Sequence, residues 1–282
     1  MTFQPLLPST GIVGFQLLSR TEETQRAVFE RQPALSREVD YFVRNIGSVT
    51  SAEELASDRR LLRVALGAFG LDEDLDKRAF IQRMLAEGVE DSESFANQFV
   101  DPRYGRLSEA FGFGSTLGPQ VARPGFAQEI AAAYSERQFE IAVGDQDESL
   151  RLALNFRREI QTYANASDPS GTAWLSVLGD RPVRAVFEGA FGLPSAFGQL
   201  DVDRQAEEMR EASQRFFGSD SLAAFQDPAV VEQAINRFLA RRAAEAGPTA
   251  ATPGFAALTL LNFANGGLGS TGVQNIILSS VR

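Results

Sequence analysis

Apolar residues along most of the chain recur every three or four positions, which is the spacing of an α-helix that buries one face. The range 36–46 illustrates this pattern with Val39, Phe42, Val43 and Ile46. Runs in which apolar and polar residues alternate, as they do in half-buried strands, are absent from the sequence. The pattern therefore predicts an all-α fold.

Glycine, proline and capping residues divide this pattern into separate helices. Residues 1–8 are expected to be extended, because Pro5 and Pro8 each disfavour helical backbone in the preceding residue. Residues 112–125 are rich in Gly, Pro, Ser and Thr and are expected to form a loop. We expect a short helix around Trp174, and helices or helix pairs over residues 10–31, 36–46, 51–66, 76–88, 92–99, 101–111, 124–143, 148–163, 181–190, 201–217 and 228–246.

The pentapeptide GAFGL occurs twice, at residues 67–71 and 189–193. An Asp-Pro pair follows each copy, and a similar helical stretch precedes each, at residues 41–46 and 155–160. The sequence therefore predicts two related multi-helix units in tandem. The motif residues are Gly67, Phe69, Gly70, Leu71, Gly189, Phe191, Gly192 and Leu193, and the paired residues are Asp101, Pro102, Asp227 and Pro228.

We interpret GAFGL as a repeated helix end. Gly70 and Gly192 can adopt the left-handed backbone conformation that terminates a helix without steric cost. We expect the phenylalanine before each glycine, Phe69 or Phe191, to anchor in the core. We expect the leucine after it, Leu71 or Leu193, to make the hydrophobic contact that closes the cap. Each Asp-Pro pair is expected to start a helix, with Asp as the N-cap and Pro at the first helical position.

The repeat predicts three segments: a first unit with an uncharged N-terminal stretch (1–115), a second unit (123–246) and a tail (247–282). No charged residue occurs from Ala246 to Val281, and the PGFA of residues 253–256 repeats that of residues 124–127. Two interpretations of the tail follow. It is the start of a third copy that caps the second unit, or it becomes ordered against another subunit or partner.

Composition and charge exclude several classes of function. A formal net charge of -10 argues against nucleic acid or an anionic membrane as the main partner. The absence of Cys and His excludes thiolate nucleophiles, zinc–thiolate sites and Ser-His-Asp triads. Neither a secretory signal nor a membrane span is recognisable. We therefore expect a soluble, cytoplasmic protein.

Some local patterns resemble functional sites but have simpler interpretations. Residues 267–272 match GxGxxG, but a helix and not a strand is expected before them, so they are interpreted as a flexible turn. The acidic run 72–76 lacks the glycine turn of a calcium loop and is interpreted as a helix start. Carboxylate and arginine pairs are interpreted as exposed helix faces with local ion pairs: Glu22-Glu23, Glu53-Glu54, Glu207-Glu208, Arg59-Arg60, Arg157-Arg158 and Arg241-Arg242. No catalytic, cofactor-binding or metal-ligating residue is predicted.

Two stretches resemble a known protein family. The first contains Asp40-Tyr41-Phe42 and Asn45-Ile46-Gly47, and the second, residues 58–71, reads DRRLLRVALGAFGL. They resemble an uncharacterised alphaproteobacterial family, a domain of unknown function whose genes lie among flagellar genes. The resemblance covers about residues 10–245. It implies a role near flagellar assembly, in the axial structure, its export or its regulation, and it implies no catalytic residue.

From these features we expect a non-enzymatic structural or interaction protein that is associated with the flagellum. Its partner would be a flagellar or other protein, and it would act in the cytoplasm, at the flagellum or after export through the flagellar apparatus. The alternative is a small-ligand or regulatory binding module, with an apolar ligand in a Phe-lined cleft between the two units. The sequence leaves the oligomeric state open.

Overall fold

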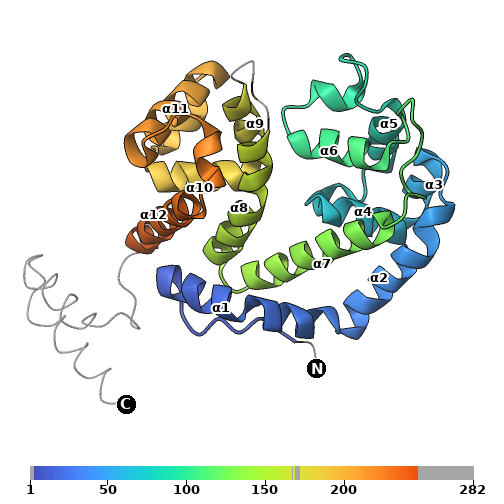
Figure 1. The fold of residues 1–282 in the computed structure, drawn as a ribbon, viewed down its shortest axis with the longest axis horizontal. Coiled ribbons are helices and arrows are strands. Elements are labelled where there is room, and N and C mark those ends of the chain that lie inside the picture. The colour runs from blue at the N-terminus through green and yellow to red at the C-terminus, as the bar shows by residue number, and fades with distance from the viewer. Residues whose placement is uncertain (1–2, 167, 169–171, 247–282) are drawn as a thin grey trace, which may run out of the picture. The chain divides into compact units, whose positions relative to one another are not determined.

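A computed structural model describes residues 3–166, 168 and 172–246, which form helices joined by turns and loops. The α-helices are α1 (Gly11–Glu30), α2 (Pro33–Asn45), α3 (Ala52–Ser57), α4 (Arg59–Ala68), α5 (Arg78–Glu87), α6 (Pro102–Phe111), α7 (Phe126–Gly144), α8 (Glu148–Asn165), α9 (Ala173–Gly179), α10 (Arg181–Phe191), α11 (Val202–Phe217) and α12 (Pro228–Ala246). Short 3₁₀ helices are η1 (Ile46–Ser48), η2 (Asp72–Asp74), η3 (Phe95–Gln98), η4 (Ser195–Gln199) and η5 (Leu222–Gln226). No strand occurs in the described residues, so the predicted all-α fold is confirmed (Figure 1).

The residues up to Arg241 belong to one compact unit. A second unit starts at Arg242, and the structure describes its residues 242–246, at the end of α12. The predicted tail (247–282) therefore lies outside the described residues, together with its GxGxxG pattern and its PGFA repeat. No helix in the described part of the chain is both long and apolar enough to cross a membrane.

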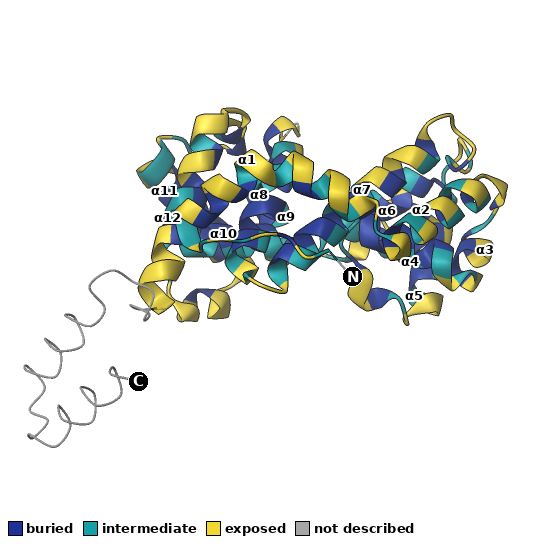
Figure 2. Cartoon of the chain, turned by 90° about the horizontal axis from the view of Figure 1, so that it is seen from below, coloured by how far each residue is buried: buried dark blue, intermediate teal, exposed yellow. Residues whose placement is uncertain are grey.

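Two hydrophobic cores fill the compact unit. Helices α2 to α6 and the start of α7 build the first core, while α1, the end of α7 and α8 to α12 build the second. Helix α7 thus contributes to both, with Phe126 and Tyr134 in the first core and Phe139 and Val143 in the second. Figure 2 shows that buried residues follow the inner faces of these helices. Each core is consequently built from both of the units that the sequence predicts.

The first GAFGL copy ends α4 with a pair of backbone hydrogen bonds. The Leu71 N–H donates to the Leu66 carbonyl at 3.0 Å, and the Gly70 N–H donates to the Gly67 carbonyl at 3.2 Å. This pattern requires a left-handed residue, and Gly70 has a φ of 70°. Leu71 is buried beneath the turn, whereas Phe69 is half-buried at the edge of the first core.

The second copy ends α10 in the same way. The Leu193 N–H donates to the Glu188 carbonyl at 3.0 Å, and the Gly192 N–H donates to the Gly189 carbonyl at 3.2 Å. Gly192 also has a φ of 70°. Here the burial is reversed, because Phe191 is buried and Leu193 is half-buried. The glycines thus have the same conformation in both copies, whereas the buried apolar neighbour is the leucine in the first copy and the phenylalanine in the second.

The glycines of the motif also let a second helix approach closely. A Cβ at Gly67 would lie 2.6 Å from the Tyr134 ring, and a Cβ at Gly70 would lie 2.8 Å from the Arg137 guanidinium. Both of these partners belong to α7. The second copy has the same arrangement with α12, where Phe238 faces Gly189 and Arg241 faces Gly192.

The two Asp-Pro pairs both start a helix. Pro102 and Pro228 are the first residues of α6 and α12. The Asp101 and Asp227 carboxylates each accept a hydrogen bond from the backbone N–H two residues further on, at 3.0 and 2.8 Å. These caps satisfy N–H groups that have no partner within the helix.

Two helical ranges differ from the prediction. Helix α2 begins at Pro33 and not at residue 36, since proline fits the first turn of a helix. In the range 92–99 only η3 is helical. There the Asn97 amide donates to the Val89 and Asp91 carbonyls at 2.9 and 2.8 Å, and such side-chain bonds to the backbone compete with a regular helix.

Helices follow one another in a similar order before and after α7. In the first half α4 packs on α2 and α3, and α3 packs on α5. In the second half α10 packs on α8 and α9, and α9 packs on α11. This shared order agrees with a duplicated unit, and the tandem repeat itself stays a prediction from the sequence.

We predict that Gly70→Val lowers the free energy of unfolding by more than about 1 kcal/mol, because a β-branched residue is forced into left-handed backbone. The matched control is Gly105→Ala in α6, where a Cβ meets no atom within 4 Å. That control is expected to gain about 0.5–1 kcal/mol from the lower backbone entropy of alanine. Urea denaturation of both variants measures the two effects. An unchanged midpoint for Gly70→Val would mean that the motif does not set the helix end.

Candidate functional site

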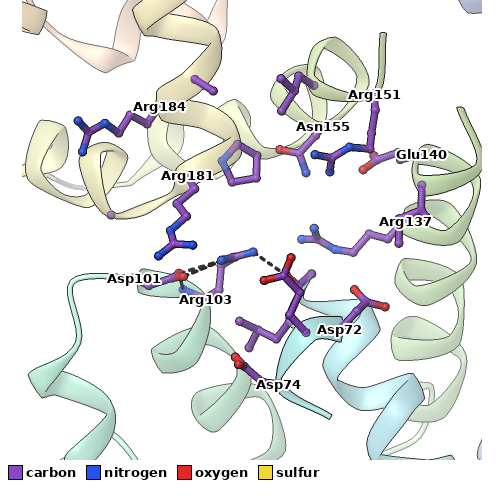
Figure 3. A pocket seen from close by; sticks show the side chains of 18 of the residues that line it. Asp72, Asp74, Asp101, Arg103, Arg137, Glu140, Arg151, Asn155, Arg181 and Arg184 are labelled. Atoms are coloured by element: carbon purple, nitrogen blue, oxygen red, sulfur yellow. Dashed lines mark hydrogen bonds and ion pairs between the residues drawn. The ribbon is translucent and has the colours of Figure 1, made fainter. Parts of the chain in front are cut away.

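A groove of about 990 Å³ lies between the two halves of the compact unit. One wall comes from η2 and the start of α6, the opposite wall from the start of α10, and the side from α7 and α8 (Figure 3). Phe99 is the one phenylalanine among the described residues that line it. Charged residues of both signs make up half of the lining residues: Asp72, Glu73, Asp74, Lys77, Asp101, Arg103, Arg137, Glu140, Asp145, Glu148, Arg151, Arg181 and Arg184.

Many of these charges are already neutralised by neighbours. Arg103 contacts both Asp101 oxygens, with Nη2 at 2.7 Å from Oδ2, and its Nη1 donates to the Gly70 carbonyl at 2.6 Å. Arg184 pairs with Glu188 at 2.6 Å. Further pairs around the groove are Lys77 with Asp74 and Arg151 with Glu148.

The acidic run 72–76 occupies one wall, and its carboxylates point to different partners. Asp74 accepts hydrogen bonds from Lys77 and from the Tyr104 hydroxyl, both at 2.6 Å. Asp76 pairs with Arg59 at 2.6 Å. The run forms a separate 3₁₀ helix, η2, and α5 begins only at Arg78 with no acidic residue in its first turn, so the interpretation of the run as the start of that helix is wrong.

Asp72, Glu73 and Asp74 of this run line the groove, and Figure 3 labels Asp72 and Asp74 among its walls. The electrostatics of Asp72 differ from those of an ordinary aspartate. Its Oδ1 accepts a hydrogen bond from the Gln138 amide at 3.1 Å. Desolvation by the surrounding atoms raises the pKa of the Asp72 carboxyl, although the residue remains open to solvent on one side. The groove wall therefore presents a carboxylate that protonates more readily than an ordinary aspartate.

Two residues on the groove walls have unused hydrogen-bonding capacity. Asn155 of α8 is only 4% exposed, and its Oδ1 has no hydrogen-bond partner. Arg181, at the start of α10, is exposed and forms neither an ion pair nor a hydrogen bond with any described residue. Figure 3 shows the Asn155 amide beside Arg151 and Arg181 projecting from the facing wall. Arg181 is thus open to a bound molecule, whereas Asn155 Oδ1 is covered by the surrounding atoms.

Behind the groove lies a buried cluster of ion pairs that joins helices of both halves. Glu159 of α8 contacts the guanidinium groups of Arg106 (α6), Arg137 (α7) and Arg158 (α8), with Arg106 at 2.6 Å. Arg137 also donates to the Ala68 carbonyl at the end of α4, at 2.8 Å. Glu159 itself is 5% exposed. One carboxylate thus connects three helices.

The charges of this cluster are balanced. Arg158 also pairs with Glu140 at 2.8 Å, and Arg106 pairs with Asp180 at 3.2 Å. Burial alone would raise the pKa of Glu159, but the charges of Arg137, Arg106 and Arg158 overcome this effect and lower the pKa to about 2. The Glu159 carboxylate therefore stays ionised across the physiological range.

Tyr163 completes the cluster. Its hydroxyl donates to Asp180 Oδ2 at 2.8 Å, and burial together with the Asp180 charge raises its pKa above the ordinary tyrosine value. Asp180 also caps α10, since its Oδ1 accepts from the Val183 N–H at 3.3 Å. The cluster is thereby connected to the start of the helix that carries Arg181.

The structure brings some of the sequence candidates to this region and corrects one interpretation. Gly70 and Asp101 line the groove through their contacts with Arg103. Arg158 was expected in an ion pair on an exposed helix face, but it is half-buried within the cluster. Asn155 and Glu159 are not among the site residues predicted from the sequence. A signal was present, because both lie on the same side of α8 as the buried Phe156.

Comparison with known proteins shows similarity to a family and to one solved structure. The family model described as "Protein of unknown function (DUF1217)" matches residues 68–231. The crystal structure of protein AGR_C_984 from Agrobacterium tumefaciens is similar with a TM-score of 0.71 and 27% identity, covering 87% of this chain and 100% of that one. No curated protein shows a significant match.

We predict that Glu159→Gln lowers the free energy of unfolding at pH 7 by about 3 kcal/mol, because the buried Arg137 and the half-buried Arg106 and Arg158 lose their shared carboxylate. Since the pKa of Glu159 is depressed in the folded state, its stabilising effect is present above its unfolded pKa of about 4.3 and is lost as the pH falls toward 2.

Denaturation curves at several pH values test this prediction. The wild-type protein should lose more stability between pH 5 and pH 2 than Glu159→Gln does. Glu53→Gln, on the exposed side of α3, is the matched control and should behave as the wild type. Parallel pH profiles for wild type and Glu159→Gln would contradict the assigned role of the carboxylate.

Proposed function

Because the chain belongs to the DUF1217 family, whose function is unknown, we propose its role from the groove and from the sequence features. The protein is a non-enzymatic interaction protein, and the groove is the surface that receives its partner. The resemblance of its sequence motifs supports a role in flagellar assembly, export or regulation.

The observation that carries this proposal is the combination of paired charges and unused hydrogen-bonding groups in one groove. Asp74, Asp101 and Glu148 are engaged by neighbouring cations, so they are poorly suited to act as free acids or bases. Arg181, in contrast, is exposed and has no partner among the described residues, so its guanidinium is available to a ligand. A groove with these properties favours recognition of another molecule over chemical conversion of it.

A small-ligand or regulatory module is the second candidate. A groove of about 990 Å³ is within the range of small-molecule sites. Among the described residues, this groove is lined by one phenylalanine and by many charged side chains, so the ligand in this case would be polar. Binding of a polar metabolite with retention of motility in a groove variant would favour this candidate.

We predict that deletion of the gene in a flagellated bacterium that carries it impairs swimming and filament formation. Complementation with Arg181→Glu is expected to restore less swimming than wild type does, because the variant reverses a groove charge that has no described partner. Arg20→Glu is the matched control, since Arg20 is exposed on α1 and does not line the groove. Normal swimming with intact flagella after deletion would exclude the flagellar role.

A photo-crosslinking residue at position 181 tests the groove directly, with position 20 as the control. The proposal expects a crosslinked flagellar protein from position 181 that position 20 does not give. The same products from both positions would show that the groove is not the contact surface.

A further inference from the structure

Two arginines occupy matching positions before the two GAFGL copies. Arg59 and Arg181 each lie eight residues before the first glycine of their copy. Each is the first residue of a helix, α4 or α10, and each follows an aspartate that caps that helix. The surroundings of the two guanidinium groups can therefore be compared position by position.

In the first copy a carboxylate neutralises this arginine. Asp76 lies nine residues after the first glycine of the motif, and its Oδ1 is 2.6 Å from Arg59 Nη1. A cation in the first turn of a helix is opposed by the helix dipole, so a carboxylate beside it is favourable. The acidic run 72–76 supplies this carboxylate.

The second copy has no matching carboxylate. The same distance from the motif leads to Gly198, and residues 194–198 read PSAFG, without an acidic residue. Arg181 is exposed and has no ion-pair or hydrogen-bond partner among the described residues. The second copy thus keeps the arginine and lacks the group that neutralises it in the first.

A hollow of about 400 Å³ lies at this place beside α10. It shares two lining residues with the groove, Arg181 and Arg184, and Figure 3 shows that both extend from α10. The other residues that line the hollow are Glu188, Leu193, Pro194, Ser195 and Gly198. The hollow is therefore continuous with the surface to which we assign the partner.

The hydrogen-bond donors around the hollow are available to a ligand. Glu188 contacts Arg184 through Nε at 2.6 Å, and the Nη atoms of Arg184 donate to no described residue. Arg184 Nη2 lies 3.6 Å from the position that a Cβ at Gly198 would take. Ser195 is exposed, and its hydroxyl makes no hydrogen bond with a described residue. Guanidinium and hydroxyl groups in this arrangement favour an anion.

We infer that the hollow binds a carboxylate from an acidic segment of the partner protein, in the place that Asp76 fills in the first copy. The inference rests on the function proposed above, because it names the chemistry of the partner beside the groove. A carboxylate is favoured over other anions because the first copy neutralises the matching arginine with this group. The apolar Leu193 and Pro194 provide contacts for the carbon atoms of a peptide.

Titration of the full-length protein at low salt with an end-blocked tetraglutamate peptide tests this inference, with end-blocked tetraglutamine and inorganic phosphate as further probes. The wild type is expected to bind tetraglutamate about tenfold more tightly than either of the other probes. Arg181→Ala and Gly198→Asp are each expected to weaken this binding about tenfold. The first variant removes the cation, and the second supplies the carboxylate from within the chain.

Two matched controls accompany these variants. Gly198→Asn adds a side chain of similar size without the charge, and Arg59→Ala removes the matching arginine of the first copy. Both are expected to bind tetraglutamate as the wild type does. Equal weakening by Gly198→Asn would overturn the inference, since the size of the side chain and not its charge would then be responsible.

The carboxyl that Gly198→Asp introduces gives a second measurement, which needs no ligand. Gly198 has no left-handed backbone, and a Cβ there meets only Arg184 Nη2 at an ordinary contact distance, so the variant is expected to fold. By NMR, the pKa of this carboxyl is expected to lie below its pKa in the double variant Gly198→Asp, Arg181→Ala. Equal pKa values would overturn the inference, because Arg181 would then not act on a carboxylate in the hollow.

The binding outcomes separate the possible ligands. Tetraglutamate binding that Arg181→Ala and Gly198→Asp both weaken supports the inference. It is overturned if the wild type does not bind tetraglutamate, or binds tetraglutamine or phosphate as tightly. That result together with impaired swimming of Arg181→Glu would reject the acidic partner and retain the proposed function. The expected peptide binding with normal swimming after deletion of the gene would reject the function and retain the carboxylate site.

Discussion

The shared use of Glu159 by three guanidinium groups is the interaction on which the arrangement of the two halves depends. Arg106 reaches it from α6 in the first core, Arg137 from α7, and Arg158 from α8 in the second core. A buried carboxylate of this kind is stable only with all its partners in place, because removing one leaves an uncompensated charge. The cluster therefore favours one relative placement of these helices over others that would bury the same apolar area.

The GAFGL motif is connected to this cluster. The Arg137 guanidinium packs so closely against Gly70 that a Cβ at this position would clash with it. From there Arg137 contacts both the Ala68 carbonyl and Glu159. The motif thus ends α4 and at the same time admits the side chain that neutralises the buried carboxylate. In the second copy Arg241 lies against Gly192 in the corresponding way, although no equivalent carboxylate cluster is attached to it among the described residues.

Much of the fold could be predicted from the sequence, and much of the site could not. Helix positions and the left-handed glycines follow from local rules, since spacing and caps act within a few residues. Glu159 illustrates the limit of these rules. Its neighbours in sequence suggested an exposed pair, but Arg106 and Arg137 come from other helices, and local patterns do not encode which helices meet. The unpartnered Asn155 Oδ1 could not be predicted either, because the lack of a partner depends on which helices surround α8 and not on the sequence of α8 itself.

The cluster and the groove share side chains, and this has a consequence for function. Arg137 lines the groove and also forms an ion pair with Glu159. Asp180 pairs with Arg106 of the cluster and immediately precedes Arg181, the first residue of α10. A ligand that pulled Arg137 or α10 toward itself would have to disturb buried ion pairs, which is costly. A ligand that engages Arg181 would avoid this cost, since Arg181 is exposed and does not belong to the cluster. Under the proposed function, Arg181 is therefore the groove residue that can contact a partner without disturbing the buried ion pairs.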